Sequence, residues 1–352
     1  MSIPAVDEQY LFDSLVALLN TPSPTGLAEP AVALAEEKLR AFSELHLHRT
    51  RKGGLVAHWP GKSHDLPRAL TAHVDTLGAV VKEIKDNGRL KLSKIGSFAW
   101  NTVEGEGCTI FRSSHPLEPG LRGSFLVETA SAHIYGAQVG ETKRDDESME
   151  VRLDAFTTTS AETRALGVAV GDFVSFDPRV EVNQGFIRSR HLDDKACVAC
   201  VLAAVKALHD AGLQPARDTT VFVSNFEEVG HGAAAGIPPE TAELLVVDMA
   251  AVGEGQKSDE FHVSLCVKDS HGPYHHAFSQ SLRRIAEGNQ IPYRTDVYVR
   301  YNSDGLATLR SGADLAVGLI GPGVDASHSY ERTHREALLA TTQWLCAYLL
   351  AE

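Results

Sequence analysis

The chain has 352 residues, of which 43% are hydrophobic and 22% charged, and its formal net charge is −13 at pH 7. These proportions are typical of a globular protein long enough for about two domains. The negative charge argues against nucleic acid or an anionic membrane surface as a partner, because both repel an acidic chain. No apolar run reaches the roughly 18 residues of a transmembrane helix, so we expect no membrane partner.

The N-terminal segment and the cysteines indicate the compartment. The first ten residues, MSIPAVDEQY, contain no basic segment followed by an apolar run, which predicts that there is no signal peptide. The five cysteines are an odd number and are scattered along the chain. Free thiols of this kind are typical of a reducing environment, so the sequence predicts a cytoplasmic protein.

Helical and strand patterns alternate in the first part of the chain. Leucines at helical spacing begin the series, and the prolines and glycine of NTPSPTG end the first helix. The patterns predict helices over residues 7–19 and 29–43, and strands over residues 55–59 and 68–74.

The composition and the hydrophobic pattern of the sequence change after Asp75. Residues 76–177 contain short strand-like runs, many glycines and threonines, and no long helical pattern. Asn87-Gly88 between two such runs predicts a hairpin. This stretch is therefore expected to form a small, β-barrel-like domain inserted into the chain.

The alternation of strands and helices returns at residue 178 and continues to the C-terminus. It predicts helices over 193–212, 279–290 and 335–352, and strands over 219–226, 242–248, 295–301 and 313–321. Alternation of this kind predicts an α/β fold with a mostly parallel sheet covered by helices. We therefore expect one α/β domain made of residues 1–75 and 178–352, interrupted by residues 76–177.

Histidines and carboxylates follow the predicted strands at the points where they end. Functional groups of an open α/β sheet gather outside the carboxyl ends of its strands, so these side chains are expected to meet at one rim. The candidates come from five segments: His73 with Asp75, Asp193, the pair Glu227-Glu228, Asp248, and His328.

These residue types fit a hydrolytic site with two metal ions. Two neighbouring divalent ions need a bridging carboxylate, mixed nitrogen and oxygen ligands, and an open position for water. We expect Asp193 to be the bridge. His73 and Asp248 would then bind one ion, and Glu228 and His328 the other.

Two acids remain for other roles. Asp75 lies two residues beyond His73, and a carboxylate on the far imidazole nitrogen of a ligand fixes its tautomer. Glu227 is adjacent to the ligand Glu228. We expect Glu227 to accept a proton from metal-activated water and to return it to the leaving amine.

The motifs HVD, LDDK, FEEVGHGA, VVD and SHSYE, in this order, resemble those of the TET-type aminopeptidases, the family of glutamyl and deblocking aminopeptidases. The resemblance covers essentially the whole chain. It implies a phosphorylase/hydrolase-like exopeptidase fold, two zinc or cobalt ions per subunit, and the removal of N-terminal residues from a peptide substrate. Manganese is an alternative, because such ligand sets also accept it.

The resemblance also implies an assembly and a set of site residues. Residues 76–177 would be a dimerisation domain, and the chain a homo-oligomer built from dimers, up to a dodecamer. Asp304, in NSDG, stands at the family's Gly-Thr-Asp and is given no role here. The family's ligands and base fall on His73, Asp193, Glu228, Asp248, His328 and Glu227.

DSHGPYHH (269–276) and GVDASHSYERTH (323–334) resemble a subgroup associated with the N-acetylglutaminylglutamine amide osmoprotectant system. Two alternatives stay open: a metal-dependent amidase or deacylase acting on a small N-acylated or amidated dipeptide, and a non-catalytic scaffold that retains the fold. The early position of the insertion favours the aminopeptidase, because related deacylases carry their extra domain between the third acid and the last histidine. The sequence leaves open the preferred N-terminal residue.

Overall fold

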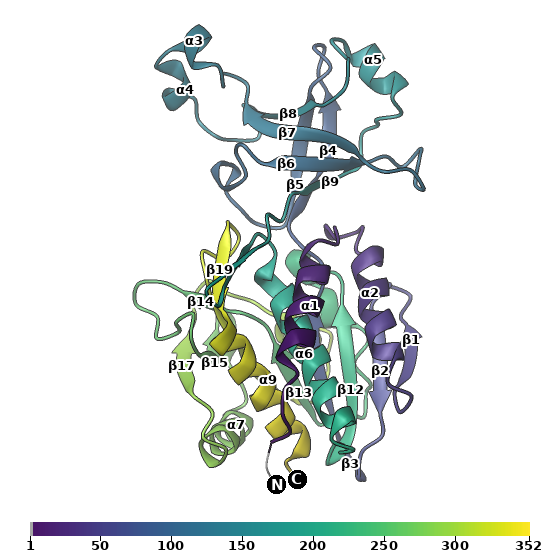
Figure 1. The fold of residues 1–352 in the computed structure, drawn as a ribbon, viewed down its shortest axis with the longest axis vertical. Coiled ribbons are helices and arrows are strands. Elements are labelled where there is room, and N and C mark those ends of the chain that lie inside the picture. Colours follow the sequence, from purple (N-terminus) through teal and green to yellow (C-terminus); the bar gives the residue numbers. More distant parts are fainter. Residues whose placement is uncertain (1–2) are drawn as a thin grey trace. The chain divides into compact units, whose positions relative to one another are not determined.

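The computed structural model describes residues 3–352 and divides the chain into two compact units (Figure 1). Unit 1 contains the chain up to Asp75 together with Arg179–Glu352, and unit 2 is Thr76–Pro178. Every predicted site residue belongs to unit 1. The prediction of an α/β fold with a mostly parallel, covered sheet and an inserted β-barrel is confirmed.

Unit 1 contains one 13-stranded sheet. Its strands are β1 (His46–Arg49), β2 (Leu55–Trp59), β3 (Ser63–His73), β10 (Glu181–Asn183), β11 (Phe186–Ser189), β12 (Arg217–Ser224), β13 (Glu243–Val247), β14 (Ala250–Val252), β15 (Val263–Asp269), β16 (Gly272–Pro273), β17 (Tyr293–Val297), β18 (Ala316–Asp325) and β19 (Glu331–His334). The main order is β1-β2-β12-β3-β13-β18-β19-β11-β10. The central strands β12, β3, β13 and β18 are mutually parallel, and antiparallel pairs extend the sheet towards its edges.

The helices of unit 1 are α1 (Glu8–Leu19), α2 (Glu29–Arg40), α6 (Leu192–Asp210), α7 (His276–Gly288), α8 (Asp304–Arg310) and α9 (Arg335–Leu350), with two short 3-10 turns, η2 (Glu227–Val229) and η3 (Gly232–Ala234). Figure 1 shows α1, α6 and α9 lying across one face of the sheet. Successive residues of a strand point to opposite faces. On β13, Leu245 and Val247 join the core with these helices, whereas Leu244 and Val246 join a second cluster.

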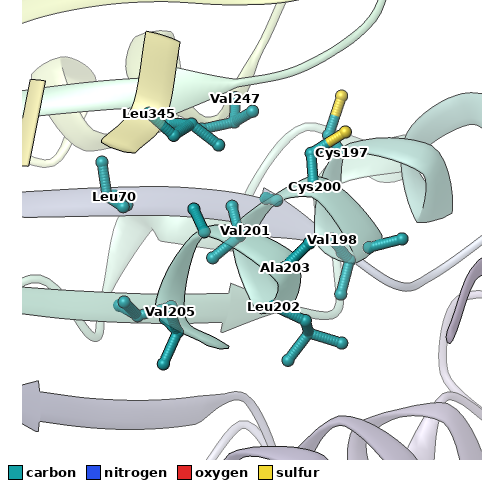
Figure 2. Packing of buried hydrophobic residues seen from close by; sticks show 14 of the residues in the cluster. Leu70, Cys197, Val198, Cys200, Val201, Leu202, Ala203, Val205, Val247 and Leu345 are labelled. Atoms are coloured by element: carbon teal, nitrogen blue, oxygen red, sulfur yellow. The ribbon is translucent and has the colours of Figure 1, made fainter. Parts of the chain in front are cut away.

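Helix α6 is the centre of the larger core. All of its residues from Leu192 to Val205 are buried, because the Ala- and Val-rich sequence is apolar around the whole helix. Figure 2 shows its side chains with Leu70 of β3, Val247 of β13 and Leu345 of α9. Packing of this kind fixes the N-terminal end of α6, where Asp193 lies, against the sheet.

Unit 2 is a closed barrel with the strand order β4-β5-β8-β7-β6-β9. It carries its own apolar core, which includes Phe125, Val151 and Phe176. Its elements are β4 (Gly78–Ile84), β5 (Leu90–Ile95), η1 (Trp100–Thr102), β6 (Gly107–Phe111), β7 (Leu121–Val127), α3 (Ala132–Tyr135), α4 (Gln138–Glu141), β8 (Met149–Leu153), α5 (Ser160–Ala165) and β9 (Phe173–Phe176).

The predicted elements differ from the observed ones mainly at their ends. The strand expected over 295–301 is β17 and ends at Val297; beyond it, Tyr298 and Tyr301 stack on each other with ring centroids 5.1 Å apart. The strand expected over 313–321 is β18 and continues to Asp325, where it pairs with β14. Within residues 3–352, the helices lack the combination of length and apolar character that crossing a bilayer requires.

Candidate metal centre

The parallel centre of the sheet brings the predicted site residues to one edge. His73 is the last residue of β3 and pairs in register with Ser224, the last residue of β12. Asp248 directly follows β13, which lies on the other side of β3. Because parallel strands end at the same edge, the Glu227-Glu228 turn that follows β12 lies beside His73 and Asp248.

Asp193 lies between the two histidines. Its Oδ1 is 3.3 Å from His73 Nε2, and its Oδ2 is 3.4 Å from His328 Nε2. His328 Nε2 is also 3.6 Å from Glu228 Oε2. One carboxylate therefore faces both imidazoles, which is the placement that a ligand shared by two cations needs.

The ligand atoms form two compact groups. One contains His73, Asp194 and Asp248, and the other contains Asp193, Glu228 and His328; within each group the ligand atoms lie within 4.8 Å of one another. The structure thus brings all five sequence-predicted ligands to one site. Asp194, which lies in the motif LDDK, had no role predicted from the sequence; its Oδ2 accepts the backbone N–H of His73 at 3.1 Å.

Glu227 belongs to neither group but lies beside them. Its Oε2 is 3.7 Å from His73 Nε2, and 14% of its side chain is exposed. The 3-10 turn η2 turns both acids of the pair to the same side of the sheet, although neighbouring residues of a strand would face opposite sides. Glu227 is therefore placed to reach a water molecule or a substrate at the cation groups.

Asp75 anchors this turn. Its carboxylate accepts the backbone N–H groups of Glu227 at 3.2 Å and Glu228 at 3.3 Å, and the hydroxyl of Thr25 at 2.7 Å. For His73 Nδ1, the Asp75 backbone carbonyl is the nearer oxygen at 3.0 Å, and the carboxylate Oδ1 lies at 3.5 Å. The sequence predicted the Asp75 carboxylate as the main partner of His73. In the structure, the oxygens of this carboxylate mainly accept backbone N–H groups of the Glu227-Glu228 turn.

The pKa values of the two central groups of the site shift in favour of their charged forms. Burial disfavours the imidazolium of His73, but hydrogen bonds with Asp193 and Asp75 and the charges of Asp194 and Glu227 outweigh burial and raise its pKa well above the usual value. Burial also disfavours ionisation of Asp193, yet the hydrogen bonds from His328 and His73 lower its pKa. An ionised Asp193 therefore suits a bridging role.

Burial and mutual repulsion oppose ionisation of the surrounding acids. Burial, followed by repulsion from Asp193, raises the pKa of Glu228 to about 8 and that of Asp248 to about 7. Burial, with the charges of Asp248 and Asp304, raises the pKa of Glu227 well above its usual range. Bound cations would stabilise the ionised forms of these acids, and a mixed set of carboxylate and imidazole donors suits divalent ions of the first transition row. The residues present therefore fit a divalent metal centre.

Other buried groups support the site from outside. Asp304 of α8 accepts the Ala233 N–H at 2.7 Å and the Ser224 hydroxyl, which ties the segment after the Glu pair to β12. Glu331 of β19 accepts the N–H groups of Asp193 and His328. The sequence placed both acids inside quoted motifs but gave them no role, because an acid that binds backbone N–H groups leaves no spacing pattern.

The histidines of the motifs FEEVGHGA and DSHGPYHH lie outside both cation groups. His271 pairs with the Asn302 side chain at 2.6 Å, and His275 caps helix α7 by accepting the Phe278 N–H at 3.3 Å. His231 stacks on Phe226 with ring centroids 5.0 Å apart. Their contacts indicate local structural roles.

Comparison with known proteins is consistent with this geometry. The chain is 46% identical over 333 residues to the "Putative aminopeptidase YhfE" of Bacillus subtilis (strain 168), covering 94% of this chain and 95% of that protein. Its fold matches a TET aminopeptidase from the marine sediment archaeon Thaumarchaeota archaeon SCGC AB-539-E09, with a TM-score of 0.86, 16% identity, and coverage of 97% and 96%. It also matches the Pyrococcus horikoshii TET1 peptidase, with a TM-score of 0.82, 19% identity, and coverage of 97% and 100%.

A family model described as M42 glutamyl aminopeptidase matches residues 53–344. This range includes both cation groups, the Glu227-Glu228 turn and all of unit 2. With the fold and the near relative in agreement, the chain belongs to the M42 glutamyl aminopeptidase family.

Proposed function

We propose that the chain is an aminopeptidase that uses two divalent cations to hydrolyse the N-terminal residue from peptides. The observation that carries this proposal is the Asp193 carboxylate, which lies 3.3 Å from one imidazole and 3.4 Å from the other. Asp193 would bridge the ions, His73 and Asp248 would hold one, and Glu228 and His328 the other. The donor set favours zinc or cobalt, with manganese as an alternative.

Such ions supply Lewis acidity and activate water. Glu227 accepts one proton from the attacking water while the water oxygen bonds to the scissile carbonyl carbon. Glu227 then gives that proton to the leaving amine as the C–N bond breaks. Burial raises the pKa of Glu227, which makes its carboxylate a stronger proton acceptor.

Asp75 holds Glu227 in place through the backbone N–H group, so its part in the reaction is to position the base. Removal of the N-terminal residue, rather than cleavage within a peptide, is proposed here by similarity to the M42 glutamyl aminopeptidase family.

Unit 2 is proposed to be a dimerisation domain of a homo-oligomer. It exposes Leu117 and Phe156 almost completely, at 99% and 103%, and Ile134 at 75%. Large apolar side chains of this kind often mark protein–protein contacts. The Pyrococcus horikoshii TET1 peptidase can assemble into a tetrahedron or an octahedral shell, and a dimer-based assembly up to a dodecamer is proposed here by similarity.

A cytoplasmic location is proposed from the cysteines. All five are buried as free thiols, which suits a reducing compartment.

Replacing Glu227 with Gln tests the proposal. Turnover of aminoacyl 4-nitroanilides is expected to fall by about 10²–10⁴-fold, because the amide cannot accept the proton, while cation content stays unchanged. Glu254→Gln, at an exposed site in the same unit, is the control and should keep full turnover. Retained turnover in E227Q would exclude Glu227 as the base.

The same assay separates the alternative substrates. A set of free aminoacyl substrates with added Zn²⁺, Co²⁺ or Mn²⁺ identifies the preferred residue and ion, and N-acetylated versions measure the need for a free amine. Selective hydrolysis of an N-acylated or amidated dipeptide would favour the amidase or deacylase hypothesis and membership of the osmoprotectant-associated subgroup. Cations bound without any turnover would favour a scaffold.

A further inference from the structure

Glu331 is a fully buried carboxylate with no part in the proposed chemistry. It is the first residue of β19, and its backbone is paired with Ser189 of β11 in an antiparallel ladder. Strand residues paired in this way are held more rigidly than loop residues. The side chain therefore projects from a fixed point of the sheet.

Each oxygen of this carboxylate binds a different segment of the site. Oε2 accepts the backbone N–H of Asp193, and Oε1 accepts that of His328, both at 3.0 Å. These are the two residues whose side chains approach to 3.4 Å in one cation group. A single side chain thus sets the spacing between a segment at the start of α6 and a loop far away in the sequence.

The loop that carries His328 depends on this contact. Ala326 and His328 have φ angles of 56° and 63°, a left-handed conformation that residues other than glycine rarely adopt. Within the loop, the Ser329 N–H donates to the Ala326 carbonyl at 3.0 Å. The Glu331 carboxylate adds an acceptor for the N–H of His328 itself, which stabilises a turn that its own sequence does not favour.

We propose that Glu331 is a positioning residue that presets the Asp193–His328 pair for one of the two cations. This inference depends on the proposed two-cation function. Without Glu331, the ion held by Asp193, Glu228 and His328 would have to order the loop when it binds. The ion held by His73 and Asp248 does not need that loop, so its affinity should be less affected.

The substitution Glu331→Gln removes one acceptor and keeps the size of the side chain. The amide has one oxygen, so its NH₂ group must face either the Asp193 or the His328 N–H, which leaves two donors opposed in a buried place. Glu331→Asp keeps the charge, but its shorter side chain cannot reach both N–H groups. Both variants are expected to loosen the same pair.

Asp296 offers a matched control. It is also a buried carboxylate of unit 1, and its Oδ2 accepts the backbone N–H groups of Lys257 at 2.7 Å and Ser258 at 2.8 Å. It belongs to neither cation group. Asp296→Asn therefore measures what the loss of a buried, N–H-binding carboxylate does to stability alone.

The experiment is calorimetric titration of the cation-free proteins with Zn²⁺ and with Co²⁺, together with their thermal unfolding. The wild type is expected to bind two ions. E331Q and E331D are expected to bind the ion held by Asp193, Glu228 and His328 about 10–100-fold more weakly, the size of effect seen when groups supporting a ligand are removed. The other ion should lose clearly less affinity, because it shares only the bridging Asp193 with the disturbed pair. D296N should keep both affinities even if its unfolding temperature falls.

Two results would overturn the inference. One is wild-type binding of both ions by E331Q and E331D; the other is an equal loss of both ions in step with the fall in unfolding temperature, as for a purely structural residue. These results leave the proposed function standing. A wild-type protein that binds no divalent cation would overturn the proposed function and this inference together.

Discussion

At the site, burial and neighbouring charges compete to set the pKa of each residue. His73 and Asp193 keep their charges because each faces the other, whereas Glu228 and Asp248 are driven towards their neutral forms. A cation must therefore displace protons before these carboxylates can bind it. We therefore expect the cation-free site to release protons when it binds metal ions.

The release of protons predicts that the affinity for cations depends on pH. The pKa of Glu228 is raised to about 8 and that of Asp248 to about 7, so both hold part of a proton at pH 7 in the cation-free protein. Because protonation increases as pH falls, apparent cation affinity should weaken as pH drops through this range, and proton release should diminish at higher pH. Calorimetry at pH 7 in two buffers of different ionisation enthalpy should show the release of about two protons per chain, because the imidazolium of His73 must also lose its proton before it binds a cation. A binding enthalpy independent of the buffer would contradict this expectation.

The site residues differ in how far the sequence could predict them. Residues at the carboxyl ends of strands, such as His73 and Asp248, could be predicted because parallel strands end at one edge. Asp194 and Glu331 were not, because their roles are hydrogen bonds to backbone N–H groups of residues distant in sequence. Such contacts depend on the final path of the chain.

Elements position the site through close backbone approaches. The Asp248 N–H donates to the Ile320 carbonyl of β18 at 3.1 Å, just where β13 ends. A Cβ added at Gly321, the next residue of β18, would lie 1.8 Å from the Asp248 carbonyl oxygen. The absence of a side chain at Gly321 therefore allows Asp248 to lie against β18.

Gly321→Ala is predicted to displace Asp248 and to destabilise the fold. A forced contact in a packed region costs typically about 1–3 kcal/mol and sometimes more, and here it falls on rigid backbone. Urea unfolding of the cation-free protein should show the loss of stability, and titration should show weaker cation binding. Gly253→Ala, where an added Cβ meets nothing within 4 Å, is the matched control and should change neither quantity. Equal behaviour of the two variants would exclude the close approach as a constraint.

The types of the elements were predictable, and their ends less so. The helix over 193–212 and the strand over 242–248 are found as α6 and β13, because both have long apolar patterns. The extension of β18 to Asp325 depends on its pairing with β14. The paired residues of β18 lie beyond the apolar run from which the strand over 313–321 was predicted. A tertiary partner of this kind is not visible in local sequence.

At the scale of the whole molecule, the two units are built on different patterns. Unit 1 combines a sheet with helices on its faces, and unit 2 closes a barrel around a separate core. The change of sequence pattern after Asp75 indicated this difference. Residues 76–177 contain short strand-like runs rich in glycine and threonine and no long helical pattern that could cover a sheet. The role of unit 2 in assembly remains a prediction by resemblance.

Phe156→Asp tests that role. If the exposed Phe156 lies in a subunit contact, the charge would have to be buried there, which strongly disfavours association. Light scattering after gel filtration should then show a smaller assembly. Val182→Asp, at an exposed valine of β10 in unit 1, is the control. An unchanged molar mass in F156D would argue against a contact at this position.

The place of β3 in the sheet has a consequence for synthesis on the ribosome. This strand carries His73 and lies between β12 and β13, yet all of unit 2 is translated before either neighbour emerges. The nascent β3 must therefore wait unpaired on both edges while the barrel strands appear. During translation the inserted barrel can close first, and the proposed metal centre is completed only when the loop bearing His328 has left the exit tunnel.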